Sequence, residues 1–198
     1  MASDIVRNVL EHVWKSLEPL GYPMALMGGL SLAAWHHLRA TRDVDLLIAV
    51  DRSAIDRVIG ALVACGCHPK KLPPLLTVGD HCFAQFLYTP PEAFYEVQFD
   101  LLLAETELQR SAIRRRVSRD VPGVDAKIDV LSCEDVILFK LLAGRVIDRA
   151  DAAMLLRENR DEIDFVYLID WIKRQQLEAE YAEICAEAFP DEEQPELP

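Results

Sequence analysis

The feature of this sequence that most restricts its fold is a change in the spacing of its apolar residues at Ser132. Before Ser132, short apolar runs of strand length alternate with helix-like segments, and glycine and proline turns separate them. After Ser132, apolar residues recur at helical spacing almost to the end of the chain. The pattern predicts an α/β half followed by an all-helical half.

The boundaries of the expected elements follow from these runs. Strands are predicted at residues 24–27, 43–50, 81–88, 94–103 and 126–130, and helices at residues 4–19, 30–38, 51–65, 106–116 and from 132 onward. Asp51 or Ser53 is the expected N-cap of the third helix, and Ser132 with Asp135 has the spacing of a capping box. We expect an α/β domain over residues 1–131, a C-terminal helical region over 132–189 and an acidic disordered tail over 190–198.

Composition excludes several classes of protein. The 198 residues include 21 Lys+Arg and 33 Asp+Glu, for a net charge of −12, and 51% of the residues are hydrophobic. Such a chain can bury a core, and its acidity argues against indiscriminate binding to nucleic acid. Because we find neither an apolar run of membrane-spanning length nor a signal-peptide pattern, we expect a cytoplasmic protein with no membrane partner. The five cysteines are expected to be reduced thiols.

Three carboxylates occupy positions where apolar strands would favour other residues. Asp43 and Asp45 are two apart in a predicted strand, so both point to one face, and Asp100 interrupts a later apolar strand. A hard divalent cation is the best way to hold such carboxylates together, and magnesium takes its remaining ligands from water and nucleotide phosphates. Upstream, Gly28-Gly29 lies at a strand-to-helix turn, where backbone N–H groups can meet a phosphate.

The order of these motifs resembles the nucleotidyltransferase superfamily, which includes DNA polymerase β and the aminoglycoside nucleotidyltransferases. Two segments, GGLSLAAWHHLRATRDVDLLI and SCEDVILFKLLAGRVIDRADAAMLL, resemble the AbiEii-type nucleotidyltransferases, the toxins of type IV toxin–antitoxin systems. The family's recurring positions are matched in this chain by Arg39, Thr41, Asp43 and Asp45, and then by Lys140, Arg145, Asp148 and Asp151. One departure is Gly29, where many active members have serine in the glycine turn.

The resemblance implies an α+β fold, with a mixed sheet flanked by helices and followed by a C-terminal helical region. It also implies transfer of a nucleoside monophosphate from an NTP to a hydroxyl, with Mg²⁺ or Mn²⁺ as cofactor. The acceptor would be an RNA or tRNA 3′ end, or a small molecule such as an antibiotic, and an antitoxin is an expected partner. The implied catalytic and metal-binding residues are Asp43, Asp45 and Asp100. The implied nucleotide-binding residues are Gly28, Gly29, Ser31, Arg39, Thr41, Lys140 and Asp148.

Several residues have a structural interpretation beside the functional one. Lys140 would contact phosphates, or instead extend to the surface or pair with Asp148, and Asp148 is either a site residue or a helix N-cap. A catalytically silent protein that binds nucleotide or a partner is the alternative function, and a binding module of a toxin–antitoxin pair is a third.

Five arginines form a basic stripe in this acidic chain: Arg110, Arg114, Arg115, Arg116 and Arg119. The stripe would either bind an RNA backbone or form a solvated face. A zinc site is the less favoured interpretation of Cys65, Cys67 and His68 with His81 and Cys82, because their spacing matches no standard zinc motif.

Overall fold

The computed structural model describes residues 2–190, so residues 191–198 of the predicted acidic tail lie outside the described residues. The strands are β1 (Met24–Met27), β2 (Asp43–Ile48), β3 (His68–Pro69), β4 (Leu75–Val78), β5 (His81–Tyr88), β6 (Val97–Leu103), β7 (Val117–Arg119) and β8 (Ile128–Val130). The helices are α1 (Ala2–Leu17), α2 (Gly28–Ser31), α3 (Ile55–Ala64), α4 (Glu107–Arg115), α5 (Cys133–Ala143), α6 (Val146–Glu158), α7 (Phe165–Gln175) and α8 (Glu178–Ala188). Three 3-10 turns are η1 (Glu18–Leu20), η2 (Leu32–Trp35) and η3 (Arg52–Ala54).

All of these strands belong to one mixed sheet, as the resemblance implied. Its order is β3-β5-β6-β2-β1-β8-β7. The remaining strand, β4, pairs with β5 outside this order. The central strand β2 runs parallel to β6 and antiparallel to β1, and β1 runs parallel to β8. The α+β fold class is therefore confirmed.

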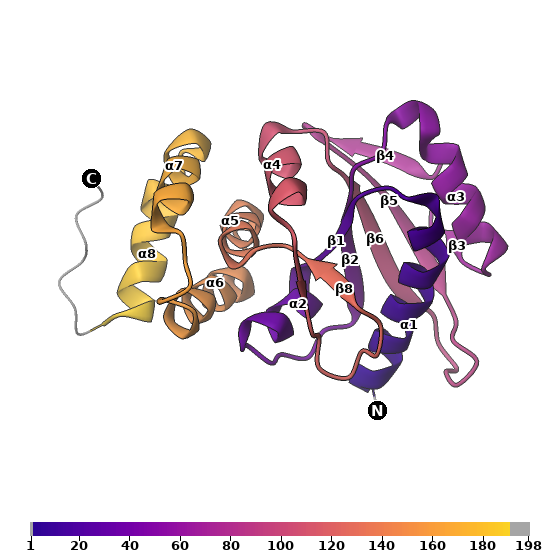
Figure 1. The fold of residues 1–198 in the computed structure, drawn as a ribbon, viewed down its shortest axis with the longest axis horizontal. Helices are drawn as coiled ribbons and strands as arrows, with labels where there is room; N and C mark the ends of the chain where they lie inside the picture. The colour runs from indigo at the N-terminus through magenta and orange to yellow at the C-terminus, as the bar shows by residue number, and fades with distance from the viewer. Residues whose placement is uncertain (1, 191–198) are drawn as a thin grey trace.

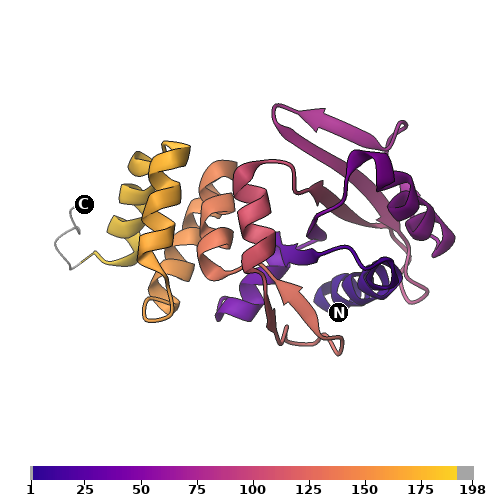
Figure 2. The same cartoon turned by 45° about the horizontal axis from the view of Figure 1, so that its top comes forward.

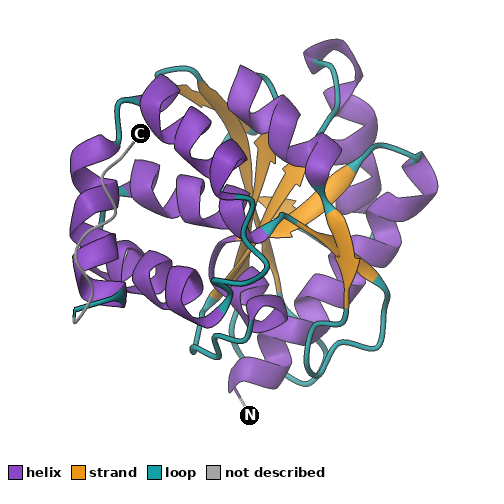
Figure 3. Cartoon of the chain, turned by 60° about the vertical axis from the view of Figure 1, so that its left-hand side comes forward, coloured by secondary structure: helices purple, strands orange, loops and turns teal. Residues whose placement is uncertain are grey.

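Helices cover both faces of the sheet, and the C-terminal helices extend the molecule to one side. In Figure 1, α1 and α3 lie together on one side of the sheet and α4 lies on the other. The helices α5 to α8 form a separate bundle at the end of the molecule opposite α1 and α3, as Figure 2 also shows. Seen from that end, the strands run between the helical layers (Figure 3). Among the described residues, no helix combines the length and apolar character needed to cross a membrane.

A buried hydrogen bond joins the bundle to the sheet half. Nδ2 of Asn159, the C-cap residue of α6, donates to the Trp35 carbonyl at 3.0 Å, and the indole Nε1 of Trp35 in turn donates to the Leu131 carbonyl within the sheet half at 3.0 Å. Paired polar groups of this kind are costly to separate because each would be left buried without a partner. The division into two domains at residue 131 stays a prediction, since the two halves are in close contact.

Helix ends in the second half follow the sequence. The backbone N–H of Asp135 donates to Ser132 Oγ at 3.3 Å, and Ser132 Oγ donates to the Asp135 carboxylate at 2.8 Å. Gly144, with φ of 67°, ends α5 in the left-handed conformation that favours glycine. The N-cap Ser132 and the stop at Gly144 agree with the prediction.

Other boundaries differ from the prediction. The helix expected at 30–38 is instead the short α2 followed by η2, and it ends at His36, whose φ is 64°. The helix expected at 51–65 begins as η3, and the Asp51 side chain makes no capping hydrogen bond. Three short strands were not predicted: β3, β4 and β7. The turn Gly79-Asp80 between β4 and β5 was a usable hairpin signal, with Gly79 at φ of 56°.

Candidate active site

The structure brings the three predicted carboxylates together. Asp45 in β2 lies opposite Asp100 in the parallel neighbour β6. Asp43 lies two residues before Asp45 in the same strand, so the two side chains point to the same face. All three line a cavity of about 510 Å³. On the intervening positions of β2, Val44 and Leu46 are buried in the core, which keeps both aspartates on the opposite face.

The carboxylates repel one another because they are close and partly removed from water. Burial, and then the negative charges of Asp43 and Asp100, raise the pKa of Asp45 from 3.8 to about 7. Burial also raises the pKa of Asp100, although hydrogen bonds from Gln98 and Gln85 oppose that shift. The amide Nε2 of Gln98 donates to Asp100 Oδ1 at 2.8 Å. The site therefore favours a positive charge or a proton among these oxygens.

The backbone of the glycine turn lies so close to the site that a Cβ at either of its residues would clash with a side chain there. Gly28 has φ of 67°, and a Cβ on it would lie 1.9 Å from Asp45 Oδ2. A Cβ on Gly29 would lie 2.6 Å from Thr41 Oγ1, and that hydroxyl donates to Asp43 Oδ1 at 2.8 Å. Gly29 therefore leaves the room that the Thr41 hydroxyl occupies, which gives a structural reason for the absence of serine at this position.

The predicted nucleotide-binding residues divide into two groups. Those that line the 510 Å³ cavity are Gly28, Gly29, Arg39, Thr41 and Lys140, together with Arg145. Ser31 is not among the residues lining this cavity: its side chain is buried, and its hydroxyl donates to the Gly28 carbonyl at 2.9 Å. Asp148 lines a smaller adjoining cavity of about 130 Å³, which shares Gly28, Asp45, Lys140 and Arg145 with the larger one.

A buried ion-pair cluster holds the cations beside the carboxylates. Lys140 Nζ lies 2.9 Å from Asp148 Oδ1 and 2.7 Å from Asp151 Oδ2, and all three side chains are buried. Arg145 Nε contacts Asp148 Oδ2 at 2.5 Å, and Arg39 Nε contacts Asp151 Oδ1 at 3.0 Å. The pairing of Lys140 with Asp148 is thus present, and Lys140 still lines both cavities together with Asp45.

Two details of this cluster were not anticipated. Asp148 is not an N-cap, because α6 begins at Val146 with Arg145 as its N-cap residue, which places Asp148 within the first turn. Asp151 matched the family pattern but had no predicted role. It is the shared partner of Lys140, Arg39 and His37. Nε2 of His37 lies 3.4 Å from Asp151 Oδ1. Its spacing from Asp148, one helical turn, was the available signal.

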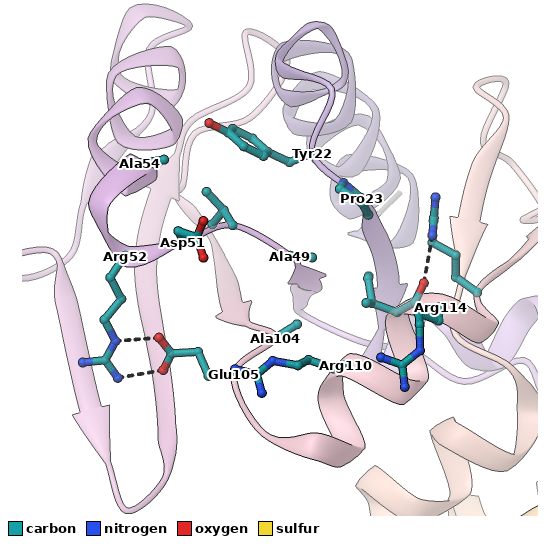
Figure 4. A pocket seen from close by; sticks show the side chains of 13 residues that line it. Tyr22, Pro23, Ala49, Asp51, Arg52, Ala54, Ala104, Glu105, Arg110 and Arg114 are labelled. Carbon is teal, nitrogen blue, oxygen red and sulfur yellow. Dashed lines mark hydrogen bonds and ion pairs between the residues drawn. The ribbon is translucent and has the colours of Figure 1, made fainter.

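The basic stripe lies away from the carboxylates. Figure 4 shows Arg110 and Arg114 beside a second cavity of about 530 Å³, together with Ala49 and Ala104. Ala49 directly follows β2 and Ala104 directly follows β6, whereas Asp43 begins β2. Because β2 and β6 are parallel, this cavity opens at the far end of the strands from Asp43.

The remaining arginines of the stripe have ion-pair partners. Arg116 also lines the second cavity, and it contacts Asp129 of the loop-to-strand segment β8 at 2.8 Å. Arg115 contacts Glu134 at 3.2 Å and stacks over Tyr167, and Arg119 contacts Glu162 and lies over Trp35. These side chains join α4 and β7 to the helical bundle and to the loop that precedes α7. The stripe therefore does not form one continuous track into the carboxylate cavity.

Comparison with known proteins identifies the family. The model of the family described as "Nucleotidyl transferase AbiEii toxin, Type IV TA system" matches residues 9–198. The chain belongs to this family. It is accordingly a nucleotidyltransferase, in agreement with the resemblance seen in its motifs. A comparison with curated proteins found no significant match.

Solved structures show the same fold at low sequence identity. An antigenic nucleotidyltransferase-like protein from Paracoccidioides brasiliensis is 20% identical, with a TM-score of 0.58, over 96% of this chain and 91% of that chain. The antibiotic-resistance factor ANT(2″)-Ia is 12% identical in its solution structure, with a TM-score of 0.57, over 90% of this chain and 94% of that chain. A crystal structure of ANT(2″)-Ia in complex with adenylyl-2″-tobramycin is 10% identical, with a TM-score of 0.54, over 91% and 97% of the two chains.

The close contact at Gly29 predicts that serine there is harmful. In Gly29→Ser, the new Cβ would displace Thr41 and break its hydrogen bond to Asp43, so nucleotidyl transfer should fall by about a hundredfold. Gly60→Ser is the matched control, because a Cβ on Gly60 would meet nothing within 4 Å. Steady-state rates measure the effect, and full activity in Gly29→Ser would contradict it.

The buried cluster predicts a large stability effect at Lys140. Lys140→Met leaves Asp148 and Asp151 short of a cation in the interior and should lower the free energy of unfolding by about 3–5 kcal/mol. Lys15→Met is the matched control, since Lys15 pairs with Glu11 on the exposed surface of α1, where the ion pair is screened by solvent, and the change in stability should be far smaller. Urea unfolding measures both, and equal effects would refute the cluster's structural role.

The raised pKa of Asp45 predicts that replacing this carboxyl by a neutral amide stabilises the fold, by an amount that depends on pH. Because the pKa of this carboxyl is about 7 in the folded protein and ordinarily 3.8, the stability of the fold falls as the pH rises from about 4 to about 7. Without divalent cations, Asp45→Asn should therefore raise the melting temperature, and more at pH 8 than at pH 5. Asp56→Asn, on the exposed side of α3, is the control. A gain that is equal at both pH values would contradict the assignment.

Proposed function

We propose that the chain transfers a nucleoside monophosphate from an NTP to a hydroxyl group and uses a divalent cation held by Asp43, Asp45 and Asp100. The observation that carries this proposal is the convergence of these three carboxylates in a cavity also lined by Arg39, Lys140 and Arg145. Anionic ligands for a cation and cationic ligands for phosphates thus lie in one cavity, which is what a metal–triphosphate complex requires.

The donor set fits a hard cation. The three side chains offer only carboxylate oxygens, the ligands that Mg²⁺ and Mn²⁺ prefer, and burial together with their mutual repulsion raises the pKa of Asp45. When bound, such a cation supplies charge neutralisation for the triphosphate and the leaving pyrophosphate.

Each surrounding residue has a proposed part. Arg145 carries an exposed guanidinium, fixed by Asp148, that can contact the triphosphate, and Lys140 adds positive charge behind it. Thr41 orients Asp43 through its hydrogen bond. Asp100, with a raised pKa and two amide donors, is suited to share in cation binding or to take the proton from the attacking hydroxyl.

A small hydroxyl-bearing molecule is the acceptor that the geometry favours. The cavity with Arg110 and Arg114 opens at the far end of β2 and β6, so the predicted RNA track does not lead to the carboxylates. ANT(2″)-Ia, bound to adenylyl-2″-tobramycin in its crystal structure, has the same fold. We propose that a similar small polyol or sugar hydroxyl is adenylylated or otherwise nucleotidylated here.

An RNA 3′ end is the second candidate acceptor. Arg39 and Arg42 line the carboxylate cavity itself, and the exposed Lys70 lies close enough to lower the pKa of Asp100. These cations could hold the last phosphates of an RNA without the basic stripe. Membership of a toxin family supports this acceptor and an antitoxin partner.

The proposal predicts transfer that depends on the carboxylates and on metal. With each labelled NTP, Mg²⁺ or Mn²⁺, and either total tRNA or a panel of aminoglycosides, label should pass to one acceptor with release of pyrophosphate. Asp43→Asn, and separately EDTA, should lower the rate by roughly three orders of magnitude. Asp51→Asn, at the other end of β2, should keep the parent rate. Nucleotide binding without transfer to any acceptor would support the silent alternative.

The two acceptors are separated by a second variant. Arg110→Ala combined with Arg114→Ala should leave transfer to a small molecule unchanged, because both side chains line the distant cavity. Transfer to tRNA that falls in this variant, and whose salt dependence weakens, would reverse our ranking of acceptors.

A further inference from the structure

The cysteine and histidine residues near position 65 do not assemble as their order in the sequence suggested. His68 Nε2 contacts Glu96 at 2.9 Å, and His81 Nδ1 is 2.8 Å from Gln109 Nε2. His12, from α1, instead joins Cys65 and Cys67, and the ligand atoms of these three residues all lie within 4.8 Å of one another. The cluster lies apart from the residues assigned to nucleotidyl transfer.

The two sulfur atoms are spaced as ligands of one tetrahedral ion would be. Cys65 Sγ lies 3.6 Å from Cys67 Sγ, and the two residues are not joined by a disulfide. With Zn–S bonds of about 2.3 Å, two thiolates of a tetrahedral zinc site are about 3.8 Å apart. Gly66, with φ of 91°, makes the turn that brings both side chains to one side.

The imidazole of His12 is held in position beside the sulfurs. Its ring stacks on Tyr88 with centroids 4.2 Å apart and an interplanar angle of 7°, and its Nε2 lies 2.9 Å from the Cys65 carbonyl. Ligation would exchange this one hydrogen bond for a bond to the metal. The bond to zinc is the stronger of the two, so the exchange is favourable.

We propose that Cys65, Cys67 and His12 bind a zinc ion, with water in the fourth position. Binding releases the two thiol protons to solvent, and the two thiolates then neutralise the dication, so the half-buried site holds no net charge. His12 carries its remaining proton on Nδ1 when Nε2 is the ligand.

The site would fasten two helices on the same side of the sheet. Cys65 and Cys67 directly follow α3, while His12 lies within α1, and these two helices pack together (Figure 1). The proposal thus assigns the ion a role in holding α1 against α3. It does not depend on the proposed transfer reaction, because none of its ligands lines the carboxylate cavity.

Cobalt(II) absorption tests the proposal on the full chain under reducing conditions. In an Asp43→Asn background, which weakens cation binding by the carboxylates, Co²⁺ should give a thiolate-to-metal charge-transfer band that saturates at one ion per chain. Zn²⁺ should displace Co²⁺, and Zn²⁺ alone should raise the melting temperature. Cys67→Ala should lose the band and the shift in melting temperature, and His12→Gln should weaken binding at least tenfold.

His68→Gln is the matched control, because His68 is next to Cys67 in the chain but pairs with Glu96. It should bind Co²⁺ as the parent does. A parent protein that gives no charge-transfer band, or a band that persists in Cys67→Ala, would overturn the proposal. Rapid closure of a Cys65–Cys67 disulfide in air, without any thiolate–metal band in reductant, would identify the pair as redox-active thiols and would also overturn it.

Discussion

The arrangement of the site depends on two buried carboxylates in α6. Asp148 and Asp151 lie one helical turn apart and would each cost several kcal/mol if left without a cation in the interior. They are neutralised from three directions: by Lys140 of α5, by Arg145 at the start of α6 and by Arg39 of the loop before β2. Because Arg39 belongs to the sheet half, the same ion pairs that stabilise the helical bundle also fix its position against the glycine turn.

The ion-pair cluster around α6 and the three carboxylates of the sheet differ in their balance of positive and negative charge. In α6 the anions are matched by cations, whereas Asp45 is buried beside two other anions, and the charges of Lys140 and Arg145 offset this only in part. The excess negative charge destabilises the ligand-free fold and favours whatever cation enters. The excess positive charge of Arg145, whose side chain is 72% exposed, faces the same cavity. The two imbalances are complementary to a metal–triphosphate complex.

Much of this arrangement was predictable because it depends on local spacing. The alternation in β2 predicts that Asp43 and Asp45 share a face, and the cap at Ser132 and the stop at Gly144 bound α5. The rest depends on contacts between distant segments. His36 ends its helix early by adopting a left-handed conformation that no local signal required, and His12 reaches Cys65 across 53 residues. Short edge strands such as β7 form mainly because a neighbour offers hydrogen bonds, so their own residues carry little signal.

The register of β1 against β2 explains why the glycine turn and the aspartates belong to one site. The two strands are antiparallel, and Met27 pairs with Asp45, so the residue that leaves β1 emerges beside the Asp45 carboxylate. Only a residue without a side chain can pass there, and Gly28 does so with positive φ. The chain must then return to the start of β2, and this return loop carries Arg39 and Thr41 to the same cavity. The segment between the glycine turn and Asp43 must therefore be long enough to reverse direction, to place these two side chains in the cavity and to enter β2 in register.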